Sequence, residues 1–180
     1  MGAFRYSRHC VGFRQQQRSH WQTGSTVDGV PERPGGFAVT KVSFYKLLGQ
    51  RHAALKLACH LIEKACKIDQ QVLCLVEDDH SAEQLDHLLW DFQPTAFIPH
   101  GRGVDQLPVA ISTDPEPGQH HQLLINLQPA TPSWFSRFER VIELIYQQPD
   151  YEQVKRENFR FFKDRGYSLS FHDLGDRFTD

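Results

Sequence analysis

The sequence predicts a single α/β domain over residues 39–180, a Rossmann-like, three-layer fold in which a mostly parallel central sheet carries helices on both faces. Three observations predict this fold class. Segments with the two-residue period of strands alternate with segments that have the period of helices. Residues 71–76 (QVLCLV) are continuously apolar, which is typical of a strand covered on both faces. A chain of 180 residues, 39% of them hydrophobic, is long enough to bury one core.

The first half of this domain contains two predicted strands and two predicted helices. Residues 41–47 are rich in aromatic and β-branched side chains and predict a strand. Apolar side chains recur at three- and four-residue steps over residues 51–67, which predicts a helix. After the strand at 71–76, the motif SAEQ predicts a second helix that has Ser81 as its N-cap and runs to about Trp90. A serine with a glutamine three residues later forms a capping box.

The second half continues the alternation. Short apolar runs predict a loop edge or strand at 96–99 and strands at 107–112 and 121–127. Aromatic and aliphatic residues at helical spacing predict a helix over residues 132–146. A last helix is predicted over residues 151–165, ended by Gly166. The alternating residues 167–172 predict an edge strand.

The N-terminal residues 1–38 differ in composition from the rest of the chain. They contain five arginines against Asp28 and Glu32, whereas the remainder carries 15 Lys and Arg against 20 Asp and Glu. The segment is rich in Arg, Gln and Gly and has no sustained apolar period, so we expect a disordered extension. One hypothesis is that translation begins at Val39, which N-terminal sequencing of the native protein would test. The alternative is a basic tail that binds DNA nonspecifically.

The chain lacks the motifs of common nucleotide-binding and hydrolytic enzymes. It contains neither GxxxxGK[ST] nor GxGxxG, so neither a P-loop ATPase nor a dinucleotide-binding dehydrogenase is indicated. It also lacks the nucleophile elbow GxSxG. The ten histidines and four cysteines show no metal-ligand spacing, so no metal or other cofactor is predicted. These absences favour a noncatalytic binding protein on an enzyme-like fold.

The acidic triplet Glu77-Asp78-Asp79 supports an alternative, a nucleotide- or metal-dependent enzyme. The triplet follows the strand at 71–76 and so lies at the carboxyl edge of the sheet, where α/β proteins bind ligands. Paired carboxylates at such an edge bind Mg²⁺. A structural interpretation is also open, in which these acids complement the dipole of the following helix.

The distribution of apolar residues and cysteines predicts a cytoplasmic protein. No apolar run approaches the roughly 18 residues of a membrane span. The N-terminus has no hydrophobic signal core. The four cysteines contain no CxxC pair and are expected to be buried thiols in a reducing compartment.

A first candidate interaction surface lies in residues 85–101, LDHLLWDFQPTAFIPHG. Trp90 stands near the end of the predicted helix, and Phe97, Ile98 and Pro99 follow within the reach of one loop. Aromatic clusters at helix–loop junctions often anchor a protein partner. The alternative is that Trp90 and Phe97 close the core.

A second candidate surface lies on the C-terminal helix, which reads KRENFRFFKDR from residue 155. Arg156, Arg160 and Lys163 share one helical face, and Phe159 lies beside it. A guanidinium suits a terminal carboxylate, and an aromatic ring suits an apolar side chain. We therefore expect a short acidic peptide with an apolar end to bind here. The alternative is an ordinary amphipathic helix with its phenylalanines in the core and its cations in solvent.

Four sequence blocks resemble the chi subunits of bacterial DNA polymerase III. They are FYKL, AEQLDHLLWDF with AFIPHG, LLINL, and RENFRFFKDRGYSL. They extend in the family's order over about residues 39–174, and residues 1–38 have no counterpart. The resemblance implies a noncatalytic accessory subunit of the clamp-loader complex, with one α/β domain that lacks nucleotide motifs.

The resemblance also implies a partner for the C-terminal helix, the acidic, Phe-terminated tail of single-stranded DNA-binding protein (SSB). DNA is then reached only indirectly. By position, Arg156 matches the family's tail-binding arginine and Phe159 its groove-lining aromatic, with Lys155 and Arg160 as neighbouring cations. An upstream lysine used in the family falls at Glu152, or at Tyr151 if the alignment shifts by one residue, and Lys155 is the candidate to replace it.

For the first surface, the resemblance implies binding to the small psi subunit, which tethers chi to the clamp loader. Phe97 matches the family's apolar anchor, with Trp90, Ile98 and Pro99 beside it. The resemblance further implies that a repair helicase can compete for the same surface.

Overall fold

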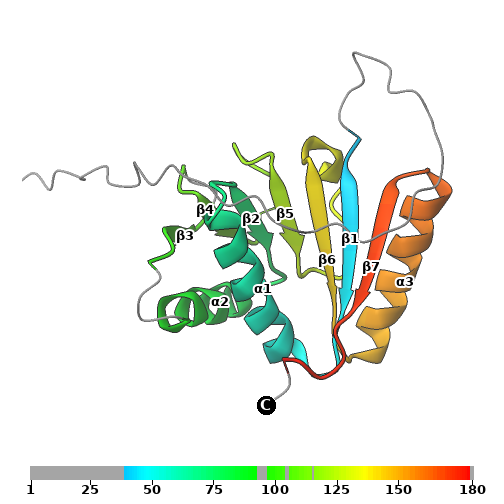
Figure 1. Ribbon diagram of the computed structural model, residues 1–180, viewed down its shortest axis with the longest axis horizontal. Coiled ribbons are helices and arrows are strands. Elements are labelled where there is room, and N and C mark those ends of the chain that lie inside the picture. The colour runs from blue at the N-terminus through cyan, green and yellow to red at the C-terminus, as the bar shows by residue number, and fades with distance from the viewer. Residues whose placement is uncertain (1–38, 93–96, 104–105, 115, 179–180) are drawn as a thin grey trace, which may run out of the picture. The chain divides into compact units, whose positions relative to one another are not determined.

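The computed structural model describes residues 39–178 except 93–96, 104–105 and 115, and these belong to one compact unit, Gly35–Asp180. The predictions for residues 1–38 therefore lie outside the described residues. Figure 1 shows a central sheet between helices. None of the helices in the described ranges is long and apolar enough to cross a membrane.

A seven-stranded sheet forms the centre of the described part, in the order β3-β4-β2-β5-β6-β1-β7. All neighbouring strands run parallel, which confirms the predicted fold class. The strands are β1 (Lys41–Lys46), β2 (Val72–Leu75), β3 (His100–Arg102), β4 (Val109–Ser112), β5 (Leu123–Asn126), β6 (Arg140–Ile145) and β7 (Ser168–Asp173).

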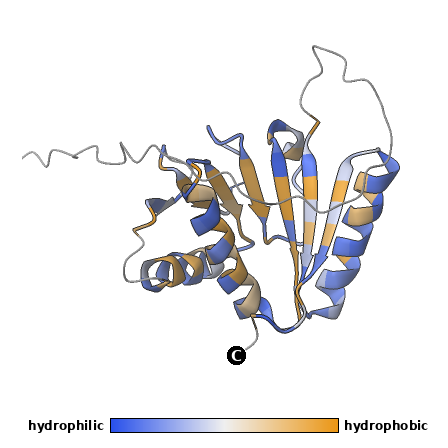
Figure 2. Ribbon diagram, in the orientation of Figure 1, coloured by the Kyte–Doolittle hydropathy of each residue, from blue (hydrophilic) through white to orange (hydrophobic). Residues whose placement is uncertain are grey.

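Helices cover both faces of the sheet. They are α1 (Arg51–Cys66), α2 (Asp79–Asp91), α3 (Pro149–Asp164) and the 3-10 turn η1 (Phe135–Arg137). Alternate side chains of β2 enter two separate cores, because successive residues of a strand point to opposite faces. Val72 and Cys74 join the core beneath α1 and α2, whereas Leu73 and Leu75 join the core that contains Phe162 of α3. Figure 2 shows that the apolar colour, orange, covers most of the central strands β2, β5 and β6.

Most predicted elements are confirmed with small changes at their ends. The strands predicted at 41–47, 71–76, 107–112 and 121–127, the helices predicted at 51–67 and 151–165, and the edge strand predicted at 167–172 are all present. In the segment predicted at 96–99, the described residues Phe97–Pro99 are irregular, and β3 begins at His100.

The predicted helix over residues 132–146 is wrong. This segment contains η1 and then β6, which pairs with β5 on one side and β1 on the other. The run from Val141 to Ile145 is wholly buried. Val141 and Ile145 enter the core on the α3 side, and Ile142 and Leu144 enter the opposite core. A strand covered on both faces is continuously apolar, and such a run also satisfies helical spacing.

The predicted N-cap of α2 is also wrong, since the helix begins one turn earlier, with Asp78 as its N-cap. The Asp78 carboxylate accepts a hydrogen bond from the Ser81 amide at 2.7 Å, so Ser81 occupies the third helical position. Hydrogen bonds from the Ser81 hydroxyl and amide lower the pKa of Asp78, with a smaller contribution from Arg51.

Replacing Asp78 with alanine is expected to lower the free energy of unfolding by about 1 kcal/mol at pH 7, as for other lost helix caps. The pKa of Asp78 is lower in the folded state than its ordinary value of 3.8. The cap's contribution is therefore fully present above pH 3.8 and is lost as the pH falls through the folded-state pKa. Urea unfolding at several pH values measures it. Asp78→Asn is the control, because asparagine also caps helices but does not titrate.

Candidate functional site

The end of α3 is determined by local sequence. Gly166 has φ +74°, a left-handed conformation that glycine adopts without strain. Its amide donates to the Lys163 carbonyl at 3.0 Å, and the Tyr167 amide donates to the Phe162 carbonyl at 3.1 Å. The Tyr167 and Phe162 rings also contact each other, with centroids 5.6 Å apart. These features are those of a Schellman motif, and they confirm the predicted stop at Gly166.

The exposed face of α3 carries the predicted cations. Arg156, Arg160 and Lys163 are all exposed. Arg156 donates a hydrogen bond from Nη2 to Glu152 Oε2 at 3.0 Å, one turn earlier. Arg160 and Lys163 form no ion pair with a described residue. An acidic ligand would thus meet two unpaired cations and one arginine that it must share with Glu152.

Phe159 lies between the sheet and the exposed face of α3. Its ring contacts Phe44 of β1 edge-to-face, with centroids 5.1 Å apart, and faces Phe171 of β7 at 6.3 Å. Phe171 is 52% exposed, so an apolar surface continues from α3 onto the outermost strand of this side. Rings in this arrangement can contact an inserted aromatic side chain, because edge-to-face contacts are favourable at these distances.

Lys155 does not belong to this exposed surface, contrary to the prediction that it contributes to tail binding. Its side chain is fully buried, and its ammonium forms an ion pair with the fully buried Glu143 of β6. Lys155 Nζ also donates to the Gln128 carbonyl at 2.6 Å and lies 5.0 Å from the centre of the Tyr151 ring. Burial lowers the pKa of Lys155, and Glu143 opposes that shift. The ammonium is therefore engaged inside the protein and does not replace the upstream lysine.

Glu143 is held by further polar groups from β5 and the following loop. Asn126 Nδ2 lies 3.1 Å from both carboxylate oxygens, and Thr131 Oγ1 donates to Oε1 at 2.9 Å. The sequence contained a signal for the burial of Lys155. Lys155 is four residues after Tyr151 and seven before Phe162, both of which are buried, so it shares their inward stripe. The sequence does not indicate Glu143 as the partner, because the spacing in residues 132–146 predicts a helix and not the buried strand β6.

The first candidate surface, in residues 85–101, lies at the end of α2. Phe97 is 75% exposed and Trp90 is 59% exposed, so the interpretation that these rings close the core is wrong. Their ring centroids are 6.2 Å apart, and Trp90 also lies 5.1 Å from the ring of His100. Two large apolar side chains that are exposed side by side are typical of a protein interaction site.

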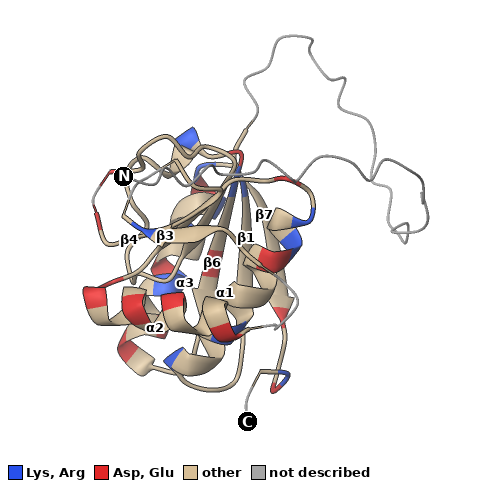
Figure 3. Cartoon of the chain, turned by 90° about the vertical axis from the view of Figure 1, so that its left-hand side faces the viewer, with Lys and Arg blue, Asp and Glu red and all other residues tan. Residues whose placement is uncertain are grey.

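The neighbouring residues of this surface differ in role. Ile98 is 5% exposed and packs in the core with α1 and α2, so it positions Phe97 and is not itself a contact residue. Pro99 is half-buried. The adjacent helix contributes Asp79, Glu83, Asp86 and Asp91 and no Lys or Arg. Figure 3 marks the Asp and Glu positions of α2 in red, so the helix beside the exposed aromatic pair is negatively charged.

Asp78, the central residue of the acidic triplet, has a structural role as the N-cap of α2. Asp78 caps α2 and lies 3.8 Å from Arg51, and Asp79 is in the first turn, where it complements the helix dipole. Glu77 is exposed. Within the described residues, no group of three or more His, Cys, Asp and Glu side chains is arranged to hold a metal ion.

A solved structure shares the fold of this chain. The crystal structure of T4 UvsW superposes with a TM-score of 0.57, covers 77% of this chain and 42% of that chain, and has 8% sequence identity. At that identity the likeness concerns only the fold.

Three curated proteins are more similar to this chain in sequence than T4 UvsW is. DNA polymerase III subunit chi of Pseudomonas aeruginosa is 38% identical over 139 residues, which span 76% of this chain and 98% of the relative. Its counterparts in Haemophilus influenzae and Escherichia coli K12 are 26% and 24% identical, over 67% and 66% of this chain and 87% and 84% of their own lengths.

The family model described as "DNA polymerase III chi subunit, HolC" matches residues 39–170. This range begins at the first described residue and includes α2, α3 and every strand except the end of β7, where Phe171 lies. The chain therefore belongs to the family of DNA polymerase III chi subunits.

Proposed function

We propose that this chain is a noncatalytic accessory subunit of DNA polymerase III in the bacterial cytoplasm, one that joins the clamp loader to SSB. In this proposal the Trp90–Phe97 surface binds psi, which connects the chain to the clamp loader. The exposed face of α3 binds the acidic tail of SSB, so contact with DNA is indirect. Residues 39–180 form the functional domain, and residues 1–38 are an extension to it.

The observation that carries the SSB contact is the combination of exposed cations and partly exposed aromatics along α3 and β7. Arg156 and Arg160 flank Phe159, which adjoins Phe171. A guanidinium binds a carboxylate through charge-assisted hydrogen bonds, and the rings accept the terminal phenylalanine of the tail. Lys163 can attract the preceding aspartates. Lys155 is excluded from this site because it is buried.

The psi contact is supported by the exposure of Phe97 and Trp90, the most exposed aromatic side chains among the described residues. Aromatic residues are enriched among the side chains that contribute most to binding. The acidic surroundings on α2 favour a partner segment that combines apolar and basic residues. A repair helicase that competes with psi would use this same surface.

Replacing Arg156 with alanine is expected to weaken binding of an SSB tail peptide by about 1.5–3 kcal/mol, which is typical of a lost hydrogen bond to a charged group. Calorimetric titration with the peptide, with and without its terminal phenylalanine, measures both contributions. Affinity should also decrease with added salt, since exposed charges are screened. An unchanged affinity of Arg156→Ala would contradict the assignment of this site.

Glu152→Gln is the matched variant, and its expected effect is opposite in sign. It removes the carboxylate that pairs with Arg156 and keeps a side chain of the same size. Exposed pairs one helical turn apart contribute about 0.3–0.5 kcal/mol, so the tail peptide should bind about twofold more tightly. Weaker binding by Glu152→Gln would instead mean that the Glu152 carboxylate positions Arg156 for the ligand.

The alternative function, a nucleotide- or metal-dependent enzyme that uses Glu77, Asp78 and Asp79, is not favoured by a specific observation. The side chain of Asp78 is already engaged as the cap of α2. If the purified chain bound a nucleotide and did not bind an SSB tail peptide, the enzyme function would be favoured over the SSB-binding function.

A further inference from the structure

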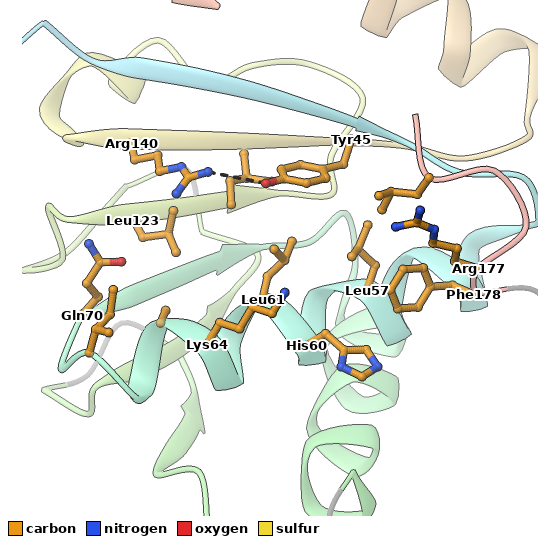
Figure 4. A pocket seen from close by; sticks show the side chains of 14 residues that line it. Tyr45, Leu57, His60, Leu61, Lys64, Gln70, Leu123, Arg140, Arg177 and Phe178 are labelled. Carbon is orange, nitrogen blue, oxygen red and sulfur yellow. Dashed lines mark hydrogen bonds between the residues drawn. The ribbon is translucent and has the colours of Figure 1, made fainter. Parts of the chain in front are cut away.

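A groove separate from both surfaces lies between α1 and the face of the sheet that α1 covers only in part. We call it the α1 groove. It has a volume of about 320 Å³ and is lined by α1, β1, β5, β6 and the residues that follow β7. Figure 4 shows Arg140 and Tyr45 entering it from the sheet, Leu61 and Lys64 from α1, and Arg177 and Phe178 at one end.

The floor of the α1 groove is aliphatic. Its apolar members come from four separate segments, so the floor is built by the fold and not by one loop; they include Leu57, Leu61, Leu123, Ile142 and Leu174. Several of these are core residues whose exposed atoms form the bottom of the groove. Pockets of this size commonly bind an apolar group of a ligand, with polar groups at the rim that orient it.

The rim is cationic. Lys64, Arg140 and Arg177 line the groove, and no Asp or Glu is among its described lining residues. None of these three cations forms an ion pair with a described residue. Three unpaired cations in an otherwise acid-rich domain form a surface complementary to a negatively charged ligand.

Hydroxyl groups of β1 orient the central cation of the rim. Arg140 Nη2 lies 3.4 Å from Ser43 Oγ and 3.5 Å from Tyr45 Oη. Ser43 is in turn hydrogen-bonded to Ser170 of β7 at 2.8 Å, and Tyr45 stacks on His172 with ring centroids 4.6 Å apart. These contacts hold the guanidinium at the groove without neutralising it, so its charge is available to a ligand.

His60 adds an uncharged group to the groove. Burial lowers its pKa, Glu63 raises it, and Lys64 lowers it further. Its ring contacts Phe92 and Phe178 edge-to-face, with centroids 4.6 Å and 5.3 Å away. The ring contacts of His60 are therefore apolar, and the positive charge of the groove comes from Lys64, Arg140 and Arg177.

We propose that the α1 groove binds an acidic peptide segment of a protein partner, with one apolar side chain of the segment on the aliphatic floor and its carboxylates at Lys64, Arg140 and Arg177. Single-stranded nucleic acid is bound by stacking its bases on exposed aromatic rings. The floor here is aliphatic, and the lining rings of Tyr45 and Phe178 already pack against the rings of two histidines, which favours the peptide over nucleic acid. The groove lies on the opposite face of the sheet from α3. Its ligand is thus independent of the proposed SSB contact.

The test uses the full chain and a fluorescein-labelled peptide in which two aspartates precede and two follow a central phenylalanine. The C-terminus of the peptide is amidated, so it lacks the terminal carboxylate of an SSB tail. Fluorescence anisotropy measures its affinity. The variant Lys64→Gln/Arg140→Gln should bind it about tenfold more weakly or worse, because two charge-assisted contacts are lost. Both side chains are exposed, so the fold should be retained.

The matched control is Arg102→Gln/Arg137→Gln, which removes two exposed cations outside the groove and should leave affinity for the amidated peptide unchanged. A separate α3 variant, Arg156→Gln/Arg160→Gln, tests the proposed SSB site. A peptide with serine in place of the phenylalanine should bind several-fold more weakly. The proposal would be overturned if the parent and Lys64→Gln/Arg140→Gln bound the amidated peptide equally well. It would also be overturned if the parent bound an oligothymidine of twelve nucleotides more tightly than the peptide. If an authentic SSB tail responds to the groove variant and not to the α3 variant, the proposed SSB site fails while the groove proposal stands.

Discussion

Replacing Lys155 with methionine is expected to lower the free energy of unfolding by about 3–5 kcal/mol, the usual loss when one partner of a buried ion pair is removed. The substitution leaves the Glu143 carboxylate in the core without its counter-ion. Asn126 and Thr131 still donate hydrogen bonds to it, but neither carries a charge. Urea unfolding monitored by circular dichroism measures the loss.

A double variant separates the loss of the ion pair from the loss of packing. Lys155→Met combined with Glu143→Gln removes both charges and keeps an oxygen that can accept from Asn126 and Thr131. It should recover more than half of the stability lost by Lys155→Met alone, because no unpaired charge is left in the core. Arg156→Ala, one residue along on the exposed face, should change stability by no more than about 0.5 kcal/mol. A loss below 1 kcal/mol for Lys155→Met would contradict the buried ion pair.

Replacing Phe97 with alanine is expected to weaken association with psi by about 2–4 kcal/mol, the range of the strongest single contacts in protein interfaces. Phe97 is three-quarters exposed in the free chain, so its removal costs little folding energy and the loss reflects the interface. Titration of purified psi into parent and variant measures it. Stability should remain within about 0.5 kcal/mol of the parent.

Phe171→Ala is the matched control for Phe97→Ala, because Phe171 is also an exposed phenylalanine but lies on β7. It should leave psi association unchanged and weaken SSB-tail binding instead. Phe97→Ala should show the reverse pattern. Loss of both activities in either variant would indicate disrupted folding, and retention of psi binding by Phe97→Ala would contradict the assignment of the surface.

Sequence reasoning was most effective where a structure depends on near neighbours. The stop of α3 at Gly166 requires only a glycine and the residues beside it, and the Schellman motif is present as predicted. The alternation of strands and helices likewise predicted a parallel sheet, because a helix between two strands is the usual crossover that brings the second strand back parallel to the first. For α2, the prediction placed the cap three residues late, since Ser81 and Asp78 both fit that role.

The sequence predicts least well where segments distant in the chain create the environment of a residue. The apolar spacing in residues 132–146 fits both a helix and a strand covered on two faces, and only the position of β6 between β5 and β1 decides between them. Because of that error, the sequence does not predict Glu143 as a buried side chain, and Lys155 is predicted to lie on the surface without a partner in the core. The α1 groove had no sequence signal, because its lining comes from segments far apart in the chain.

The α/β class and the family could thus be inferred from residues that lie close together in the sequence. The single domain after residue 38 stays a prediction. The tertiary structure decided which charges and rings face solvent. It buried Lys155 against Glu143 and exposed Trp90 and Phe97. The physical reason is that burial depends on packing between segments distant in the chain, whereas periodicity reports only how neighbouring residues are distributed around one helix or strand.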